Sequence, residues 1–406
     1  MGGRKILCGI VGKPNTGKST FFAAATLVPV KIAPYPFTTI EPNIGIAYVR
    51  TKCVCKEFNV KDNPKNSLCI DGNRFIPIQM IDVAGLVPDA WKGRGLGNRF
   101  LDELRKASVL IHVVDASGGT DEEGRIVPPG THDPCRDVEF LEKEIVMWIK
   151  QILIADWQRI VKRRESSIEE ILTEKLSGLQ ISKRDIEKTL EKTDLKSKRL
   201  ELWNDEDITR FCYEIRRENK PIVIAANKID VPTAEDGFKK LKEKYGGSSI
   251  IIPCSAEAEL VLRKAAEKGF IRYLPGDDKF EIINESKLTS EQRKALKIIE
   301  ERVLMKWKGT GIQEIINTAI LDVLKMIVVY PVEDVNKLSD HHGNVLPDAL
   351  LIRESSTARE LAYMIHQELG DTFLYAIDVR TKHKIGEDAP LKMNDIIKIV
   401  ATKARK

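Results

Sequence analysis

One short segment constrains the fold of this chain more than any other. Residues 12–19, Gly-Lys-Pro-Asn-Thr-Gly-Lys-Ser, match the pattern G-x-x-x-x-G-K-[ST] and lie between an apolar run, Ile6–Gly12, and a helical stretch, Lys18–Leu27. Glycines let backbone N–H groups close around phosphates, and the N-terminus of the following helix adds a favourable dipole. The pattern therefore predicts a phosphate-binding loop in an α/β domain whose parallel sheet is flanked by helices.

The polar residues of this loop are candidates for nucleotide binding. Lys18 can reach the β and γ phosphates as a mobile point charge, and Ser19 offers a hydroxyl ligand to Mg²⁺. Asn15 has two interpretations, because its amide oxygen could hold K⁺ beside the phosphates or the residue could simply form the turn. Equal hydrolysis rates in KCl and NaCl would count against the ion. The loop's nucleotide-binding candidates are Asn15, Thr16, Gly17, Lys18, Ser19 and Thr20.

A second motif closes the apolar run Phe75–Asp82. It reads Asp82-Val83-Ala84-Gly85. From the end of a strand, the Asp82 carboxylate could hold Mg²⁺ through water, and Gly85 could donate its backbone N–H to the γ-phosphate. The sequence therefore predicts that Asp82 lies beside the phosphate loop.

Two further motifs predict recognition of guanine. Asn227-Lys228-Ile229-Asp230 closes the apolar run Pro221–Ala226, and Ser255-Ala256 follows the run Ser249–Pro253. Asp230 can accept hydrogen bonds from guanine N1–H and N2–H₂, a pair that adenine lacks, and a site built for such donors rejects the analogue without them by several powers of ten. The second motif would place a backbone N–H near guanine O6. The candidates here are Asn227, Lys228, Asp230, Ser255 and Ala256.

The segment Pro36–Asn43, between the first two motifs, carries two threonines. Thr38 or Thr39 could bind Mg²⁺ and sense the γ-phosphate, and we favour Thr39 over Thr38 and over an ordinary lead-in to a strand. Leu86 follows Gly85, and an aliphatic side chain cannot orient a water molecule. Hydrolysis would then depend on the catalytic candidates Lys18, Thr39 and Gly85, with Mg²⁺, or on a group from a protein activator. Slow intrinsic turnover is expected.

The pattern of apolar runs and helical stretches divides the 406 residues into three parts. Residues 1–117 and 220–324 have the alternating pattern of the nucleotide-binding domain with a C-terminal helical extension. The pattern predicts a helical insertion over residues 118–219, in its simplest form a hairpin. It predicts a small β-rich domain over residues 325–406. Lysines and arginines crowd the stretch Ser182–Arg199, where a solvated helix face is favoured over an RNA-facing one. The tail Lys403–Lys406 is also basic.

Composition narrows the class of protein. Hydrophobic residues make up 42% and charged residues 31% of the chain, which excludes a mostly disordered protein. No window approaches the roughly 18 apolar residues of a membrane helix, and no signal peptide opens the chain, so a cytoplasmic protein without a membrane partner is expected. The net charge of +5 does not by itself indicate nucleic-acid binding.

The cysteines carry one metal hypothesis. Seven cysteines, an odd number, favour a reducing compartment over a disulfide framework. Cys53, Cys55 and Cys69 could bind Zn²⁺ with a fourth ligand such as Asp62. Their spacing matches no paired C-x₂-C knuckle, so cysteines without metal are the favoured interpretation. His112 lies inside the apolar run Val109–Val114 and is interpreted as a core residue.

The motifs together carry a family resemblance. Pro36–Asn43, Asp82–Leu86 and Gly95–Leu101 resemble the Obg family of translation-associated GTPases, in its YchF/Obg-like ATPase branch. The C-terminal part resembles a TGS domain in Val328-Val329-Tyr330, Ile365-His366 and Asn394–Val400. The resemblance implies a P-loop GTPase domain with an inserted α-helical domain (hairpin or coiled coil) and a C-terminal β-grasp domain. It also implies association with the ribosome or structured RNA.

Nucleotide preference is the point where this chain departs from many members of that branch. They carry a degenerate Asn-x-x-Glu motif and prefer ATP, whereas Asn227-Lys228-Ile229-Asp230 is intact. The sequence therefore favours a Mg²⁺-dependent GTPase switch, with an ATP-preferring hydrolase as the alternative. Another class is a nucleotide-dependent interaction protein whose hydrolysis is incidental. A metabolic P-loop kinase is disfavoured by the guanine motif.

Overall fold

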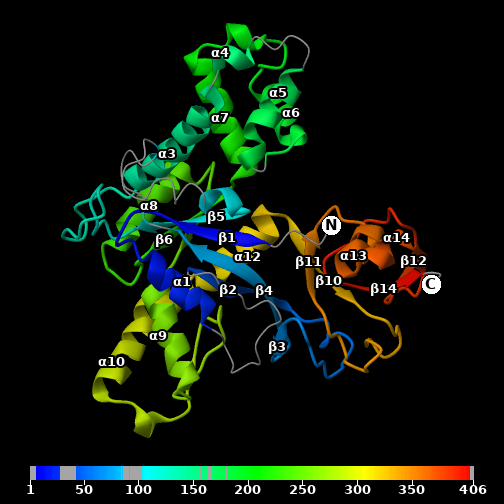
Figure 1. The fold of residues 1–406 in the computed structure, drawn as a ribbon. Coiled ribbons are helices and arrows are strands. Elements are labelled where there is room, and N and C mark those ends of the chain that lie inside the picture. Colours follow the sequence, from blue (N-terminus) through cyan, green and yellow to red (C-terminus); the bar gives the residue numbers. More distant parts are fainter. Residues whose placement is uncertain are drawn as a thin grey trace.

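A seven-stranded sheet forms the centre of the computed structural model (Figure 1). The strand order is β2-β4-β1-β5-β6-β7, with β3 paired to β4. The structure describes residues 6–27, 43–83, 85, 91, 103–155, 157–161, 167–179 and 181–402. The strands are β1 (Leu7–Val11), β2 (Ile44–Lys52), β3 (Leu68–Ile70), β4 (Asn73–Asp82), β5 (Val109–Asp115), β6 (Ile222–Asn227) and β7 (Ile250–Pro253).

The expectation of a parallel sheet is confirmed for five strands, and the two remaining strands make the sheet mixed. β4, β1, β5, β6 and β7 run parallel, whereas β2 and β3 pair antiparallel with β4. The chain passes from β2 through β3 to β4 without a crossover helix, and strands connected in that way pair antiparallel. The parallel strands bring their carboxyl ends, and the motifs that follow them, to one edge of the sheet.

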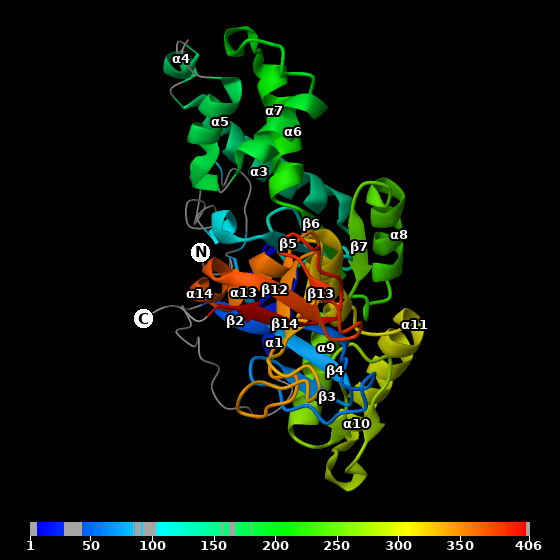
Figure 2. The same ribbon diagram turned by 90° about the vertical axis from the view of Figure 1, so that its right-hand side faces the viewer.

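Helices cover both faces of the sheet because its strand residues alternate between two cores. Cys8 and Ile10 pack with α1 and α12, while Leu7 and Val11 pack with the first insertion helix, α3. Figures 1 and 2 show the helices on the two sides. The helices of this part are α1 (Lys18–Thr26), α8 (Ala234–Tyr245), α9 (Ala256–Glu267), α10 (Ser290–Ile299), α11 (Met305–Trp307) and α12 (Ile312–Asn317). A two-stranded ribbon, β8 (Ile271–Arg272) with β9 (Glu281–Ile282), follows α9.

The helical insertion is a small bundle and not the simple hairpin that was expected. Its long helices α3 and α7 lie side by side, and α5 and α6 share their apolar core (Figure 1). Capping boxes at Ser167, Ser182 and Asn204 begin new helices, because each side chain accepts the N–H three residues on. The bounds are α3 (Cys135–Ile154), α4 (Trp157–Ile160), α5 (Ile168–Leu176), α6 (Lys183–Lys192) and α7 (Asp205–Asn219).

The C-terminal part is a five-stranded sheet in the order β11-β10-β14-β12-β13. Val329 faces α13, whereas Val328 and Tyr330 face the core shared with the central sheet. Two short helices, α13 and α14, meet at His366, where the backbone is extended and the ring accepts the Glu368 N–H to cap the second helix. The elements are β10 (Met326–Pro331), β11 (Leu350–Arg353), α13 (Ala358–Ile365), α14 (Gln367–Asp371), β12 (Phe373–Asp378), β13 (Lys384–Ile385) and β14 (Asp395–Ala401).

None of the helices in the described part of the chain combines the length and the apolarity that a membrane-spanning helix needs.

Candidate functional site

The phosphate loop joins β1 to α1 in a conformation that requires glycine. Gly17, directly before α1, has a φ of 96°, and a Cβ there would lie 2.3 Å from Asn227 Nδ2. Gly12 has a φ of 146°, and a Cβ there would lie 2.5 Å from the Val113 carbonyl oxygen. Both positions combine a left-handed backbone with no room for a side chain. Any substitution would distort the loop.

The predicted phosphate and Mg²⁺ residues converge at the carboxyl end of the sheet. Lys18 is buried and its Nζ donates to the Lys13 carbonyl at 2.6 Å. Ser19 Oγ donates to Asp82 Oδ2 at 2.8 Å. A hydroxyl and a carboxylate are the hard oxygen ligands that Mg²⁺ prefers, so this pair fits the ion. A Cβ on Gly85 would lie 3.3 Å from Lys18 Nζ, so the Gly85 backbone lies beside that ammonium group.

Some predicted residues cannot be placed. Thr38, Thr39, Leu86 and the segment Gly95–Leu101 lie outside the described residues, as does the tail Lys403–Lys406. Asn15 is described: it has a φ of 60°, and its Nδ2 donates to the Gly124 carbonyl at 2.9 Å. Thr20 is half-buried at the start of α1, and Thr16 Oγ1 donates to the Lys13 carbonyl at 3.1 Å.

The base end of the site contains a carboxylate in a fixed orientation. Ser255 Oγ donates to Asp230 Oδ1 at 2.6 Å and accepts the Ala258 N–H at 3.1 Å as the N-cap of α9. The serine hydroxyl therefore has both its donor and one acceptor position occupied. Asp230 keeps a second oxygen, Oδ2, and a half-buried position from which it can accept from a ligand.

Asn227 links the two ends of the site. Its Nδ2 donates to the Thr16 carbonyl at 2.9 Å, and its Oδ1 accepts the Ala256 N–H at 3.0 Å. The amide expected to face guanine O6 is therefore bonded to Asn227 in this arrangement. Lys228 Nζ contacts Asp115 Oδ2 at 2.8 Å, and Asp115 is fully buried at the end of β5.

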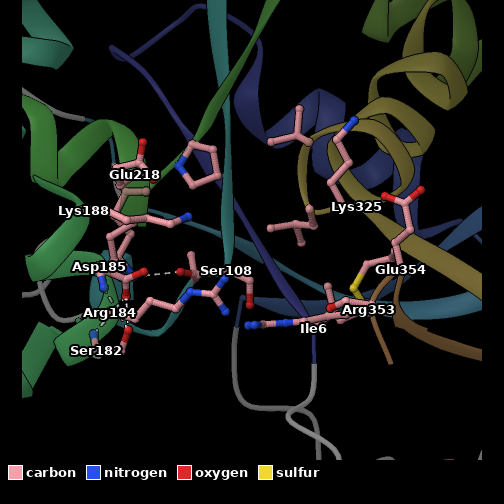
Figure 3. A pocket seen from close by; sticks show the side chains of 18 residues that line it. Ile6, Ser108, Ser182, Arg184, Asp185, Lys188, Glu218, Lys325, Arg353 and Glu354 are labelled. Atoms are coloured by element: carbon pink, nitrogen blue, oxygen red, sulfur yellow. Dashed lines mark hydrogen bonds between the residues drawn. The ribbon is translucent and has the colours of Figure 1, made fainter. Parts of the chain in front are cut away.

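A second cavity lies at the opposite edge of the sheet. It is a cleft of about 610 Å³ between the first two turns of α6, the starts of β5 and β6, and the C-terminal domain (Figure 3). Its wall carries charged side chains from two separate parts of the chain. The exposed cations are Arg184, Lys188, Lys325 and Arg353, and the acidic residues are Asp185, Glu218 and Glu354.

Comparison with known proteins gives the family. A model described as a 50S ribosome-binding GTPase matches residues 7–150, one described as an Obg-like GTPase YGR210-like, G4 motif-containing domain matches residues 225–334, and a TGS domain matches residues 342–401. An uncharacterized GTP-binding protein of Methanocaldococcus jannaschii is 51% identical over 397 residues, which cover 97% of this chain and 99% of that protein. The chain belongs to the Obg-like GTPases, in their YchF branch.

Two further proteins place this YchF-branch chain among its relatives. The crystal structure of a GTP-binding protein from Pyrococcus horikoshii OT3 is 42% identical, with a TM-score of 0.78 over 98% of this chain and 100% of that one. The ribosome-binding ATPase YchF of Bacillus subtilis is 28% identical over 271 residues, or 65% of this chain and 69% of that protein. The expected P-loop GTPase and TGS folds are confirmed.

A buried ionic cluster behind the phosphate loop was missed by the reasoning from sequence. Lys13, 1% exposed, lies 2.6 Å from Asp137 Oδ1, and the same oxygen lies 2.6 Å from His132 Nε2. Lys13 also donates to the Asp121 carbonyl. Asp137 lies in the first turn of α3, so the cluster ties the phosphate loop directly to the helical bundle. The acidic residue Asp137 in a first helical turn was the only local signal of this cluster in the sequence, and its partner Lys13 lies 124 positions away.

Burial alters the pKa of several groups around the site. It lowers the pKa of Lys18 to about 8, against the opposing effect of Asp82. It raises the pKa of the Asp137 carboxyl, against the stabilising contacts from Lys13 and His132. It also lowers the pKa of His112 to about 3, with Lys13 and Lys18 acting in the same direction, which fits the interpretation of His112 as a neutral core residue.

The buried cluster gives a stability prediction. Asp137→Asn keeps the shape of the side chain but leaves the Lys13 ammonium buried without its counter-charge. Removing one partner of a buried ion pair costs about 3–5 kcal/mol of unfolding free energy. Urea unfolding should detect that loss. Asp236→Asn, at an exposed position in the first turn of α8, is the control and should cost less than about 1 kcal/mol. Equal unfolding curves for the two variants would contradict the assigned role.

The pKa of Lys18 predicts how nucleotide affinity depends on pH. Phosphate oxygens stabilise the ammonium form, so binding above about pH 8 requires uptake of one proton by Lys18. We expect the affinity for a nucleoside triphosphate with Mg²⁺ to fall by up to about tenfold per pH unit above that pKa. Without nucleotide the sign reverses: the unfolded chain binds more protons between about pH 8 and 10.5, so stability contributed by this group rises with pH.

Fluorescent-nucleotide titrations across this pH range provide the measurement. Lys18→Arg is the matched variant, because a guanidinium stays protonated throughout the range and should flatten the pH dependence. An affinity of the unmodified protein that stays constant above pH 8 would show that Lys18 does not titrate in the site.

Proposed function

We propose that this protein hydrolyses GTP to GDP and phosphate with Mg²⁺ and acts as a nucleotide-dependent switch in the cytoplasm. The proposal depends above all on the Asp230 carboxylate, which Ser255 holds in one orientation at 2.6 Å. A fixed carboxylate is an acceptor pair for guanine N1–H and N2–H₂, and adenine offers no matching donors. The 51% identical relative is named a GTP-binding protein, which agrees with this choice.

The chain's own residues divide the work at the phosphates. Lys18 and the backbone of the loop bind and orient the β and γ phosphates, and Gly85 donates its N–H beside Lys18. Ser19 and, through water, Asp82 would hold Mg²⁺, with Thr39 as a further ligand. The ion would neutralise developing phosphate charge. Asn15 remains a candidate K⁺ ligand.

The position after Gly85 lacks a side chain that could orient the attacking water. Leu86 occupies the position after Gly85, where an aliphatic side chain cannot orient the attacking water. Turnover by the isolated protein is therefore slow, and a protein activator or the ribosome supplies the missing group.

Nucleotide competition tests the base assignment. GTP should displace a bound fluorescent nucleotide at lower concentration than ATP. Asp230→Asn should lower the affinity for GTP by about 100-fold or more, since each of the two hydrogen bonds to the charged acceptor contributes about 1.5–3 kcal/mol. The same variant should gain affinity for xanthosine triphosphate, because an amide can donate to the C2 carbonyl that replaces the guanine amino group.

Asp236→Asn is the control, and its nucleotide affinities should match those of the unmodified protein. If the unmodified protein prefers ATP, the alternative, an ATP-preferring hydrolase, is established. The Bacillus subtilis relative is named an ATPase. Binding without any turnover, even with ribosomes present, would favour a nucleotide-dependent interaction protein.

Association with the ribosome or structured RNA is the second part of the proposal. The matching family model is described as a ribosome-binding GTPase, and one relative is named a ribosome-binding ATPase. The cleft in Figure 3 offers a surface for RNA phosphates, because Arg184 and Lys188 of the bundle face Lys325 and Arg353 of the C-terminal part across it. Its small excess of positive charge suits reversible contact.

Charge reversal tests this surface. Arg184→Glu combined with Arg353→Glu should weaken binding to ribosomes and reduce the dependence of log affinity on log salt by about one unit for each phosphate that is no longer neutralised. Lys239→Glu with Lys240→Glu, at exposed positions on α8, makes the same change in net charge away from the cleft. Equal losses of affinity in the two double variants would mean that net charge, and not this cleft, determines binding.

A further inference from the structure

The segment between β2 and β3, residues 53–67, is held in shape by something other than regular structure. This segment, the insert, contains neither helix nor strand. Connections of that length without regular structure are uncommon in compact domains, where they are usually either functional loops or linker segments. The insert is nevertheless well buried at its start, where Cys53, Val54 and Cys55 join the same hydrophobic cluster as Tyr330 and Leu346 of the C-terminal part.

Four potential metal ligands converge at the base of the insert. Cys53 and Cys55 follow β2, Asp62 lies within the insert, and Cys69 lies on β3. Their ligand atoms all lie within 4.8 Å of one another. The sulfurs of Cys55 and Cys69 are 3.7 Å apart, and Cys53 Sγ lies 3.3 Å from Asp62 Oδ2. In a tetrahedral site with Zn–S bonds of about 2.3 Å, neighbouring sulfurs lie about 3.8 Å apart.

We propose that Cys53, Cys55, Asp62 and Cys69 bind one Zn²⁺ ion that fixes the insert. Three thiolates and a carboxylate complete a set of four ligands, and Zn²⁺ accepts both types of ligand. Spacing along the chain favoured cysteines without metal, because no paired C-x₂-C is present. Pairing of β3 with β4 overrides that argument, since it returns Cys69 to the end of β2.

The surroundings offset the charge of such a site. Three thiolates and one carboxylate carry four negative charges against the two positive charges of Zn²⁺. Arg74 is fully buried, and its Nη2 lies 3.4 Å from Asp62 Oδ2, where it supplies a compensating charge and orients the carboxylate. The buried hydroxyl of Tyr330 neighbours Cys53 and Arg74. A metal-bound thiolate would give that hydroxyl an acceptor.

The proposed ion would organise the contact between the two ends of the chain. Asn63 N–H donates to the Val345 carbonyl at 3.1 Å, and Lys65 N–H donates to the Pro347 carbonyl at 2.7 Å. Arg74 Nη2 donates to the Leu346 carbonyl at 2.8 Å. The C-terminal domain thus docks on backbone groups of the insert, whose positions the metal would determine.

Metal analysis of the purified full-length protein tests the proposal. We expect about one Zn²⁺ per chain, in agreement with one four-ligand site. Cys69→Ala should lose the bound zinc, whereas Cys135→Ala, at a buried cysteine on α3, should retain it. Less than about a tenth of an equivalent after incubation with Zn²⁺, or full retention by Cys69→Ala, would overturn the assignment.

Two measurements keep the test independent of whether the variants fold. Co²⁺ exchanged into the unmodified protein should give the visible spectrum of a tetrahedral ion with thiolate-to-metal charge transfer, and its absence would overturn the site. Non-reducing mass spectrometry should find free thiols after the metal is removed. A Cys55–Cys69 disulfide in freshly purified protein without zinc would instead identify the pair as a redox cross-link, because the two sulfurs are already 3.7 Å apart.

Hydrogen exchange tests the docking role. Removing the metal with a chelator should increase exchange at the amides of Asn63, Lys65, Asn66, Val345 and Leu346, with little change in the phosphate loop. Re-addition of Zn²⁺ should restore protection. Exchange that stays unchanged on metal removal would contradict the role of the ion in docking the C-terminal domain.

Discussion

The side-chain amide of Asn227 is the contact on which the nucleotide site most depends. It donates to the Thr16 carbonyl in the phosphate loop and accepts the Ala256 N–H at the start of α9. Those segments come from three separate stretches of the chain, and Asn227 is almost fully buried between them. The absence of a side chain at Gly17 is part of the same arrangement, because a Cβ there would collide with the amide. Phosphate end and base end therefore have one fixed separation.

A second buried contact extends this rigid unit into the helical bundle. The Lys13–Asp137–His132 cluster joins the residue after Gly12 to the first turn of α3. Because buried ion pairs tolerate little displacement, a shift of the phosphate loop has to move α3 or break the cluster. The α3 helix packs on α7, and α7 leads into β6, which ends at Asn227. The bundle and the nucleotide site are thus connected through two helices, α3 and α7.

How far the sequence could predict this site follows from how local each signal is. Lys18, Ser19, Asp82 and Asp230 could be placed because each belongs to a motif at or just after the end of an apolar strand, and parallel strands bring their carboxyl ends to one edge. Asp137 could not be placed, because nothing local connects it with Lys13. The hairpin expected for the insertion is too simple, although Ser182 and Asp185 carry a capping-box signature, and such a signature within a helical pattern marks a new helix start. The antiparallel pairing of β2 and of β3 with β4 could not be predicted, because the periodicity of a strand does not reveal its partner.

The cysteines also show that spacing along the sequence does not reveal contacts created by the fold. Spacing rules describe knuckles in which two ligands come from one tight turn, and Cys53, Cys55 and Cys69 do not follow them. In this fold β4 pairs with both β2 and β3, which brings Cys69 on β3 close to Cys53 and Cys55, the cysteines that follow β2. The Arg74 side chain, from the same strand, then connects Asp62 to the Leu346 carbonyl of the C-terminal part. A metal in this position would link the edge of the nucleotide-binding sheet to the C-terminal domain through a single buried arginine.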